Sequence, residues 1–167
     1  MRTTSKVALA LSVSLCTLTA CQSSKDSHAG WSYEGDTGPA HWSELSPLYR
    51  LAAEGKSQSP IDITTSAVAT GGGDVSVQCS SKCVELVNNG HSIQVNVEPG
   101  ATLTTPAGTY ELVQFHFHSP SEHTVDGEHA AMEMHLVHTD ATLRIGVVGV
   151  MIVEGAENPF LAKLWPH

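Results

Sequence analysis

The sequence predicts a mainly β domain with only minor helices, an α+β arrangement in that limited sense. Several short stretches alternate polar and apolar residues with a period of two, as strands with one buried face do. An almost unbroken apolar run covers residues 145–153, a pattern typical of a central strand buried on both faces. Glycine, proline and asparagine separate these stretches, as expected for turns. A length of 167 residues suffices for one such domain.

The remaining elements can be placed in chain order. Alternation predicts three early strands, over residues 74–78, 84–87 and 93–97. Asn88, Asn89 and Gly90 lie between the last two, and Asn-Gly is a common hairpin signal. Short helices are expected over residues 41–45 and 158–165.

Two further strands carry histidines. In residues 114–118 the side chains of Gln114, His116 and His118 share one face, and two phenylalanines share the other. Each such strand therefore has a polar face with imidazoles and an apolar face suited to a core.

The second strand covers residues 132–137, where His135 lies on the face shared with Glu133 and Val137, and methionine and leucine lie behind. Imidazoles two residues apart on one strand can meet a third from the neighbouring strand. Three histidines with an open fourth position form the pattern of a catalytic zinc site. We therefore expect Zn²⁺ to be bound by His116, His118 and His135.

Two polar residues are placed to support this site. Gln114 precedes His116 by two positions, and Glu133 precedes His135 by two. Each can accept the imidazole N–H that does not face the metal, which fixes the tautomer and orientation of the ring.

Several motifs together resemble the α-class carbonic anhydrases. They are W-x-Y, G-P-x-H-W, Q-S-P-I-D-I, N-N-G-H, Q-F-H-F-H, S-E-H and E-x-H-L-V-H, spread from residue 31 onward. The resemblance implies a large, twisted, mostly antiparallel sheet. It also implies zinc-dependent, reversible hydration of carbon dioxide to bicarbonate, so the substrate would be a small molecule.

The same resemblance implies roles for individual residues. His91 matches the histidine that carries protons between the metal site and buffer. Glu122 matches the glutamate behind the metal, and Tyr33 matches a tyrosine of the active-site hydrogen-bond network. Val137 and Val147 match the apolar wall where carbon dioxide rests.

The resemblance covers only the front part of the family's domain. In the family the chain continues into further strands and a Leu-Thr-Thr segment, whose threonine bonds to the glutamate matched by Glu122. After His138 the sequence has only Thr139 and Thr142, outside such a segment. The C-terminal strands are therefore expected to be missing, which predicts zinc binding with poor hydration activity and a tendency to aggregate. A catalytically impaired zinc-binding module is accordingly an alternative function.

A second alternative is a metalloenzyme of a different fold. His116-x-His118-x-x-x-Glu122 also satisfies the first metal motif of cupins, in which Glu122 would be a ligand. The Q-S-P-I-D-I, N-N-G-H and E-x-H-L-V-H segments are not needed by cupins and favour the first interpretation.

The N-terminus predicts export. Arg2 and Lys6 precede an apolar run over residues 7–18 that is too short to span a bilayer. Leu-Thr-Ala-Cys then resembles a bacterial lipobox, which implies cleavage before Cys21 and acylation of its thiol; an ordinary secretory signal is the alternative. The expected organisation is a signal peptide, a polar tether and the domain, over residues 1–20, 21–30 and 31–167. The protein would be a periplasmic or cell-surface lipoprotein whose only membrane contact is the lipid on Cys21.

The net charge and the cysteines bear on possible partners and on disulfide bonding. The formal net charge is −9, which argues against a nucleic-acid partner because such binding needs a basic face. Export permits disulfides. Apart from Cys21 and a cysteine in the signal, Cys79 and Cys83 remain, and we expect them to be bonded across a turn between two paired strands.

Overall fold

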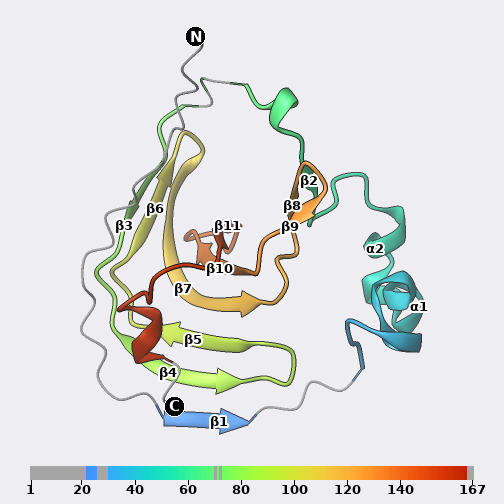
Figure 1. Cartoon of the computed structure of the whole chain (residues 1–167), viewed down its shortest axis with the longest axis horizontal. Helices are drawn as coiled ribbons and strands as arrows, with labels where there is room; N and C mark the ends of the chain where they lie inside the picture. The colour runs from blue at the N-terminus through green and yellow to red at the C-terminus, as the bar shows by residue number, and fades with distance from the viewer. Residues whose placement is uncertain (1–21, 26–29, 70, 72, 165–167) are drawn as a thin grey trace.

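The computed structural model describes residues 22–25, 30–69, 71 and 73–164, which build a large curled sheet and a small one (Figure 1). The strands are β1 (Gln22–Lys25), β2 (Asp62–Ile63), β3 (Ser76–Gln78), β4 (Cys83–Asn88), β5 (Ile93–Val97), β6 (Thr102–Thr105), β7 (Gly108–His118), β8 (Thr124–Val125), β9 (Glu128–His129), β10 (Met132–Thr139) and β11 (Ile145–Ile152). The helices are α1 (Trp42–Leu45) and α2 (Leu51–Glu54), with 3-10 turns η1 (Gly35–Thr37), η2 (Pro39–His41), η3 (Pro47–Tyr49), η4 (Thr65–Ala67) and η5 (Leu161–Lys163). The prediction of a mainly β fold with minor helices is confirmed. None of the described helices is long and apolar enough to cross a membrane.

The main sheet is organised around β7. Its strand order is β1-β4-β5-β7-β10-β11, with β6 also paired to β7 and β3 paired to β6. Every pair in this sheet is antiparallel except β1 with β4. Because β7 is long and curved, β6 pairs with residues 108–111 and β5 with residues 114–116 (Figure 1). This curl agrees with the expected twisted, mostly antiparallel sheet.

The core lies on the apolar face of the central strands. Phe115 and Phe117 are both buried, and their rings pack edge to face with centroids 5.9 Å apart. Leu136 from β10 and Val95 from β5 belong to the same buried cluster. Burial of these side chains from water is the main force that holds the strands together. It also turns the opposite, histidine-bearing face of β7 and β10 away from the core.

The apolar strand near the C-terminal end is not buried as expected. Among the described strands, β11 pairs with β10 alone. Ile145 is 69 % exposed and Val147 50 % exposed, whereas Val148 and Val150 pack against the core. The expectation of burial on both faces is therefore wrong in this structure, because an apolar run does not reveal how many of its faces are covered.

The Asn-Gly hairpin is confirmed, but the hairpin around the cysteines is wrong. β4 and β5 pair antiparallel across the turn, where the Asn89 side chain accepts hydrogen bonds from two backbone N–H groups. By contrast, β3 pairs with β6, and β4 pairs with β5 and β1, so residues 79–82 connect strands that are not each other's partners. Cys79 is half-buried and Cys83 is buried. Cys83 takes part in a disulfide, but Cys79 is not its partner, so the expected bond between Cys79 and Cys83 is wrong in this structure.

The ends of the chain differ in part from expectation. Residues 22–25, expected as tether, form strand β1 along the edge of β4. Cys21 and the signal at residues 1–20 lie outside the described residues. The helix expected over residues 158–165 is observed only as a turn that ends in η5.

Candidate metal centre

Three imidazoles converge on the polar face of two neighbouring strands. β7 presents His116 and His118, and β10 places His135 directly opposite His116 in the antiparallel register. The ring centroids lie 4.9 Å, 5.3 Å and 4.7 Å apart for the pairs 116–118, 116–135 and 118–135. One nitrogen of each ring lies within 4.8 Å of the others. The arrangement can hold a metal ion, and these are the three residues expected from the sequence.

Gln114 lies where it can set the tautomer of His116. Its Oε1 atom is 2.8 Å from His116 Nδ1. An amide oxygen only accepts hydrogen bonds, so Nδ1 carries the hydrogen and the Nε2 lone pair of His116 stays free. Nε2 of His118 is buried and has no hydrogen-bond partner among the described residues. A buried imidazole nitrogen without a hydrogen-bond partner is suited to binding a metal ion.

Glu133 lies beneath the third histidine and is 1 % exposed. One carboxylate oxygen, Oε1, is 2.9 Å from His135 Nε2 and 2.8 Å from His123 Nδ1. The other, Oε2, accepts the backbone N–H groups of Glu122 and His123 at 3.0 Å and 2.9 Å. Because Nε2 of His135 faces this carboxylate, its Nδ1 atom is the nitrogen left for a metal.

The charge state of Glu133 follows from these contacts. Burial by itself would raise its pKa, but the backbone N–H of His123 and the imidazoles of His135 and His123 outweigh that effect and keep the pKa lowered. Glu133 is therefore an ionised acceptor of hydrogen bonds.

The rings of His116 and His118 are neutral at neutral pH, as metal ligands must be. The pKa of His116 is lowered to about 4, first by burial and then by the charges of His118 and His135. The pKa of His118 is also lowered to about 4, by burial and then by His135. At neutral pH both rings therefore offer a lone pair. Two neutral imidazoles, a third imidazole beside them, an available nitrogen on each ring and a supporting carboxylate fit a zinc ion with one open position.

Glu122 and Tyr33 flank the three rings. The Tyr33 hydroxyl donates to Glu122 Oε1 over 3.2 Å. Glu122 Oε1 lies 3.4 Å from His118 Nδ1, and Oε2 lies 3.8 Å from His135 Nδ1. Burial, followed by the Glu122 charge, raises the pKa of Tyr33 to about 12, so the hydroxyl keeps its proton. The structure thus brings together both residues with the metal ligands.

His91 lies at the end of the β4–β5 turn and stacks on Trp31. The two rings are 3.8 Å apart at their centroids and inclined by only 9°. Trp31 in turn meets Tyr33 and Trp42 edge to face, at 5.4 Å and 5.3 Å. Nε2 of His91 is buried without a partner among the described residues. The N-terminal aromatic segment therefore joins His91 to the part of the site that contains Tyr33.

The two valines of the expected apolar wall face each other across strands. Val137 on β10 is paired with Val147 on β11, two residues beyond His135 on the same face. Val147 also lines a cavity of about 490 Å³ with His135, Glu122, Glu133 and five others that include Ser59 and His123. The apolar surface is thus next to the imidazoles.

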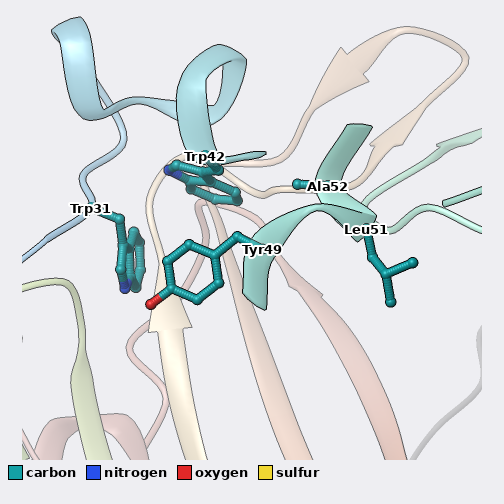
Figure 2. A pocket seen from close by; sticks show the side chains of 5 residues that line it. All are labelled: Trp31, Trp42, Tyr49, Leu51 and Ala52. Carbon is teal, nitrogen blue, oxygen red and sulfur yellow. The ribbon is translucent and has the colours of Figure 1, made fainter. Parts of the chain in front are cut away.

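A second, apolar cavity of about 330 Å³ lies away from this chemistry. It is lined by Trp31, Trp42, Tyr49, Leu51 and Ala52. Figure 2 shows the aromatic rings grouped together, with Leu51 directed away from them. None of its side chains is a carboxylate, an imidazole or a thiol, so the histidine cluster remains the candidate site.

Sequence reasoning missed two residues that touch this site indirectly. His123 contacts Glu133, and Ser59 Oγ lies 3.2 Å from His123 Nε2. Both belong to motifs singled out in the sequence, but no spacing rule links a loop histidine to a carboxylate on a later strand. The only available signal was that a buried carboxylate needs several donors.

Comparison with known proteins gives a consistent result. Residues 37–163 match the family of eukaryotic-type carbonic anhydrases. The carbonic anhydrase of Pectobacterium carotovorum is 41 % identical over 160 residues, which are 96 % of this chain and 64 % of that protein. The carbonic anhydrase of Klebsiella pneumoniae is 44 % identical over 137 residues, or 81 % of this chain and 55 % of that protein. The chain therefore spans less than two thirds of the length of these two relatives.

A solved structure shows the same similarity. The α-carbonic anhydrase of Thermovibrio ammonificans, in complex with the inhibitor sulfanilamide, superposes with a TM-score of 0.79 at 45 % identity. The match covers 83 % of this chain and 62 % of that structure.

Proposed function

This chain belongs to the family of eukaryotic-type, or α-class, carbonic anhydrases, and from that premise we propose that its histidine centre binds zinc for the reversible hydration of carbon dioxide. The observation that carries the proposal is the convergence of three imidazoles with one nitrogen of each within 4.8 Å of the others; burial lowers the pKa of two of them, His116 and His118. Oxygen-rich sites select Mg²⁺ or Ca²⁺, whereas three imidazoles suit Zn²⁺.

His116 and His118 would hold the ion through Nε2, and His135 through Nδ1. Their other nitrogens support this assignment, since Gln114 and Glu133 face Nδ1 of His116 and Nε2 of His135. When bound, Zn²⁺ supplies a Lewis acid that lowers the pKa of a bound water and so makes it a nucleophile near neutral pH. Carbonic anhydrase is the standard example of this effect.

The surrounding residues would orient the reactants and move the proton. Val137 and Val147 offer an apolar surface beside the rings for carbon dioxide, which carries no net charge. Tyr33 would hold the Glu122 carboxylate in place beside the rings of His118 and His135, where it could accept a hydrogen bond from a reactant. His91 would exchange protons with buffer, because imidazole is the side chain suited to proton transfer near neutral pH.

The direct test is carbon dioxide hydration by the zinc-loaded full chain, followed by stopped flow with a pH indicator. We expect zinc-dependent hydration that sulfanilamide inhibits, as that compound is named as the inhibitor bound to the Thermovibrio relative. His129→Ala is a matched control, because His129 bonds to the Ser121 carbonyl and is outside the three-ring cluster. Stoichiometric zinc without measurable hydration would refute the enzymatic function and favour a zinc-binding module.

We also propose that the protein is exported and acylated at Cys21, which rests on the sequence of residues 1–21 alone. Mass spectrometry of the mature N-terminus is the test. Cleavage at another position with an unmodified Cys21 would contradict lipid anchoring.

A further inference from the structure

One edge of the main sheet lacks the features that usually keep a strand edge from pairing with another chain. Strand β11 is eight residues long and, among the described strands, pairs with β10 alone. It contains no charged residue and no proline. Its even-numbered side chains pack toward the core, whereas odd-numbered ones such as Ile145 and Val147 are exposed. A long apolar strand with an unpaired edge is a template for strand addition.

The other two ends of this sheet are protected. Strand β1, at the opposite end of the strand order, has four residues, all polar, and ends in Lys25. Strand β3, which pairs with β6 only among the described strands, has three residues and is polar at both ends. Short edge strands and lysine on an edge are common means of avoiding edge-to-edge contact. The open edge at β11 is therefore a local feature of this strand and not a general property of the sheet.

The charges at the two ends of β11 fit a second copy of the same chain. Arg144 directly precedes the strand, Glu154 follows it closely, and both are exposed. Two copies of β11 can pair antiparallel about a two-fold axis at Gly149, so that residues equally far from Gly149 on either side face each other. Arg144 and Glu154 are equally far from Gly149 in the sequence. Each Arg144 would therefore face Glu154 of the partner subunit, twice in the dimer by symmetry.

The same register covers the exposed apolar residues of the strand. Ile145 is 69 % exposed and Val153, directly after the strand, is 74 % exposed. They are equally far from Gly149, so each would face the other across the two-fold axis and be removed from water. A shift of one residue would instead set the exposed face of one copy against the core face of the other. Because the chain has a net charge of −9, an uncharged strip with matched charges at its ends is where two copies meet with least repulsion.

We propose that two copies of this chain form a dimer through β11, in an antiparallel pairing centred on Gly149 that joins their main sheets. A two-fold interface of this kind occupies the open edge of both copies, so assembly stops at the dimer. Val147 and Met151 line the cavity beside His135, and in this register each faces the other residue of the partner subunit. The second copy would thus extend the apolar wall of that cavity. The pairing itself needs no zinc and is independent of the proposed enzymatic function.

The test measures dimerisation of the full chain by sedimentation velocity, with a chelator present, in variants that change the charges across the interface. Ile145→Lys with Val153→Lys sets like charges opposite each other, whereas Ile145→Lys with Val153→Glu sets opposite charges there. The Lys/Glu variant should dimerise about tenfold more tightly than the Lys/Lys variant, because two facing pairs change from repulsion to attraction. Glu154→Arg should weaken dimerisation about tenfold, and adding Arg144→Glu should restore it.

Controls separate pairing at β11 from general effects of added charge. Leu48→Lys places a lysine on a residue that is 86 % exposed and outside β11, and Glu98→Arg repeats the charge change of Glu154→Arg at an exposed position after β5. Both variants should dimerise as the original chain does. Thermal unfolding shows whether each variant keeps its fold. As a measurement without any substitution, amide hydrogen exchange over residues 145–152 should slow as the concentration of the original chain rises.

Three results would overturn the proposal. One is a monomer at every concentration, with amides of β11 that exchange slowly throughout, which would mean that another segment of the same chain covers the edge. Another is growth beyond the dimer into larger assemblies. The third is equal dimerisation of the Lys/Lys and Lys/Glu variants, which would exclude the register centred on Gly149. Failure of the chain to bind zinc or hydrate carbon dioxide would refute the proposed function and leave the dimer unaffected.

Discussion

Gly149→Ala should disturb the metal centre although Gly149 is not a ligand. Gly149 lies on β11 directly opposite His135. A Cβ atom built on Gly149 would lie 2.6 Å from Glu133 Oε1 and 3.8 Å from the His135 ring. Its backbone does not have a positive φ, so the effect of alanine would come from contact and not from backbone strain.

The size of the disturbance can be worked out from these distances. Ordinary contact begins at 3.4 Å, so the two atoms must separate by 0.8 Å. The end of a free glutamate could move that far at little cost, but Glu133 is buried, accepts three hydrogen bonds and lies against His135. If Oε1 takes up the whole shift, its 2.8 Å hydrogen bond from His123 lengthens to about 3.6 Å, which is no longer a hydrogen bond, and its 2.9 Å contact with His135 lengthens to about 3.7 Å.

The expected result is a loss of zinc affinity of about 10–100-fold. Overpacking should also lower the free energy of unfolding by about 1–3 kcal/mol. Zinc affinity is measured by competition with a chromogenic chelator, and stability by denaturant unfolding of the zinc-free protein. Gly146→Ala is the matched control on the same strand, because its Cβ would meet Leu103 and Tyr110 at ordinary distances of 3.5–3.6 Å. Wild-type zinc affinity in Gly149→Ala would refute the idea that the Glu133 position matters.

Three further predictions follow from the site and the cysteines. Alanine at His116, His118 or His135 should abolish most zinc binding, and stoichiometric metal in any of the three variants would exclude that residue as a ligand. Because burial lowers the pKa of His116 and His118 to about 4 in the folded state, the unfolded chain takes up protons first as the pH falls. The metal-free protein should therefore lose stability between about pH 6.5 and pH 4, and a flat free energy of unfolding across this range would contradict the neutral-ring argument. Unreduced protein should contain Cys83 in a disulfide that does not include Cys79, and peptide mapping under non-reducing conditions that finds a Cys79–Cys83 bond would contradict this.

Local periodicity explains how much of the fold and site was predictable. The period of two in residues 114–118 and 132–137 was enough to assign each side chain to a face, because strand side chains alternate whatever the rest of the chain does. Phe115 and Phe117 are buried as expected, and the imidazoles share the other face. Residues 145–153 were recognised as a strand, but their partners were not, because pairing depends on elements distant in sequence.

Local alternation was enough to predict β3, β4, β5, β7, β10 and β11, the faces of the histidine-bearing strands and the candidate ligands, since each depends on residues close together in the chain. Only the tertiary structure decided that His135 lies opposite His116, that β3 and β4 do not pair, and that β11 exposes one face among the described residues. It also decided that Ser59 and His123 stand behind Glu133. Strand register and sheet curvature bring together segments that are far apart in the sequence, and local periodicity contains no information about such contacts. A buried carboxylate must be hydrogen-bonded, so its donors come from the segments that the fold places next to it.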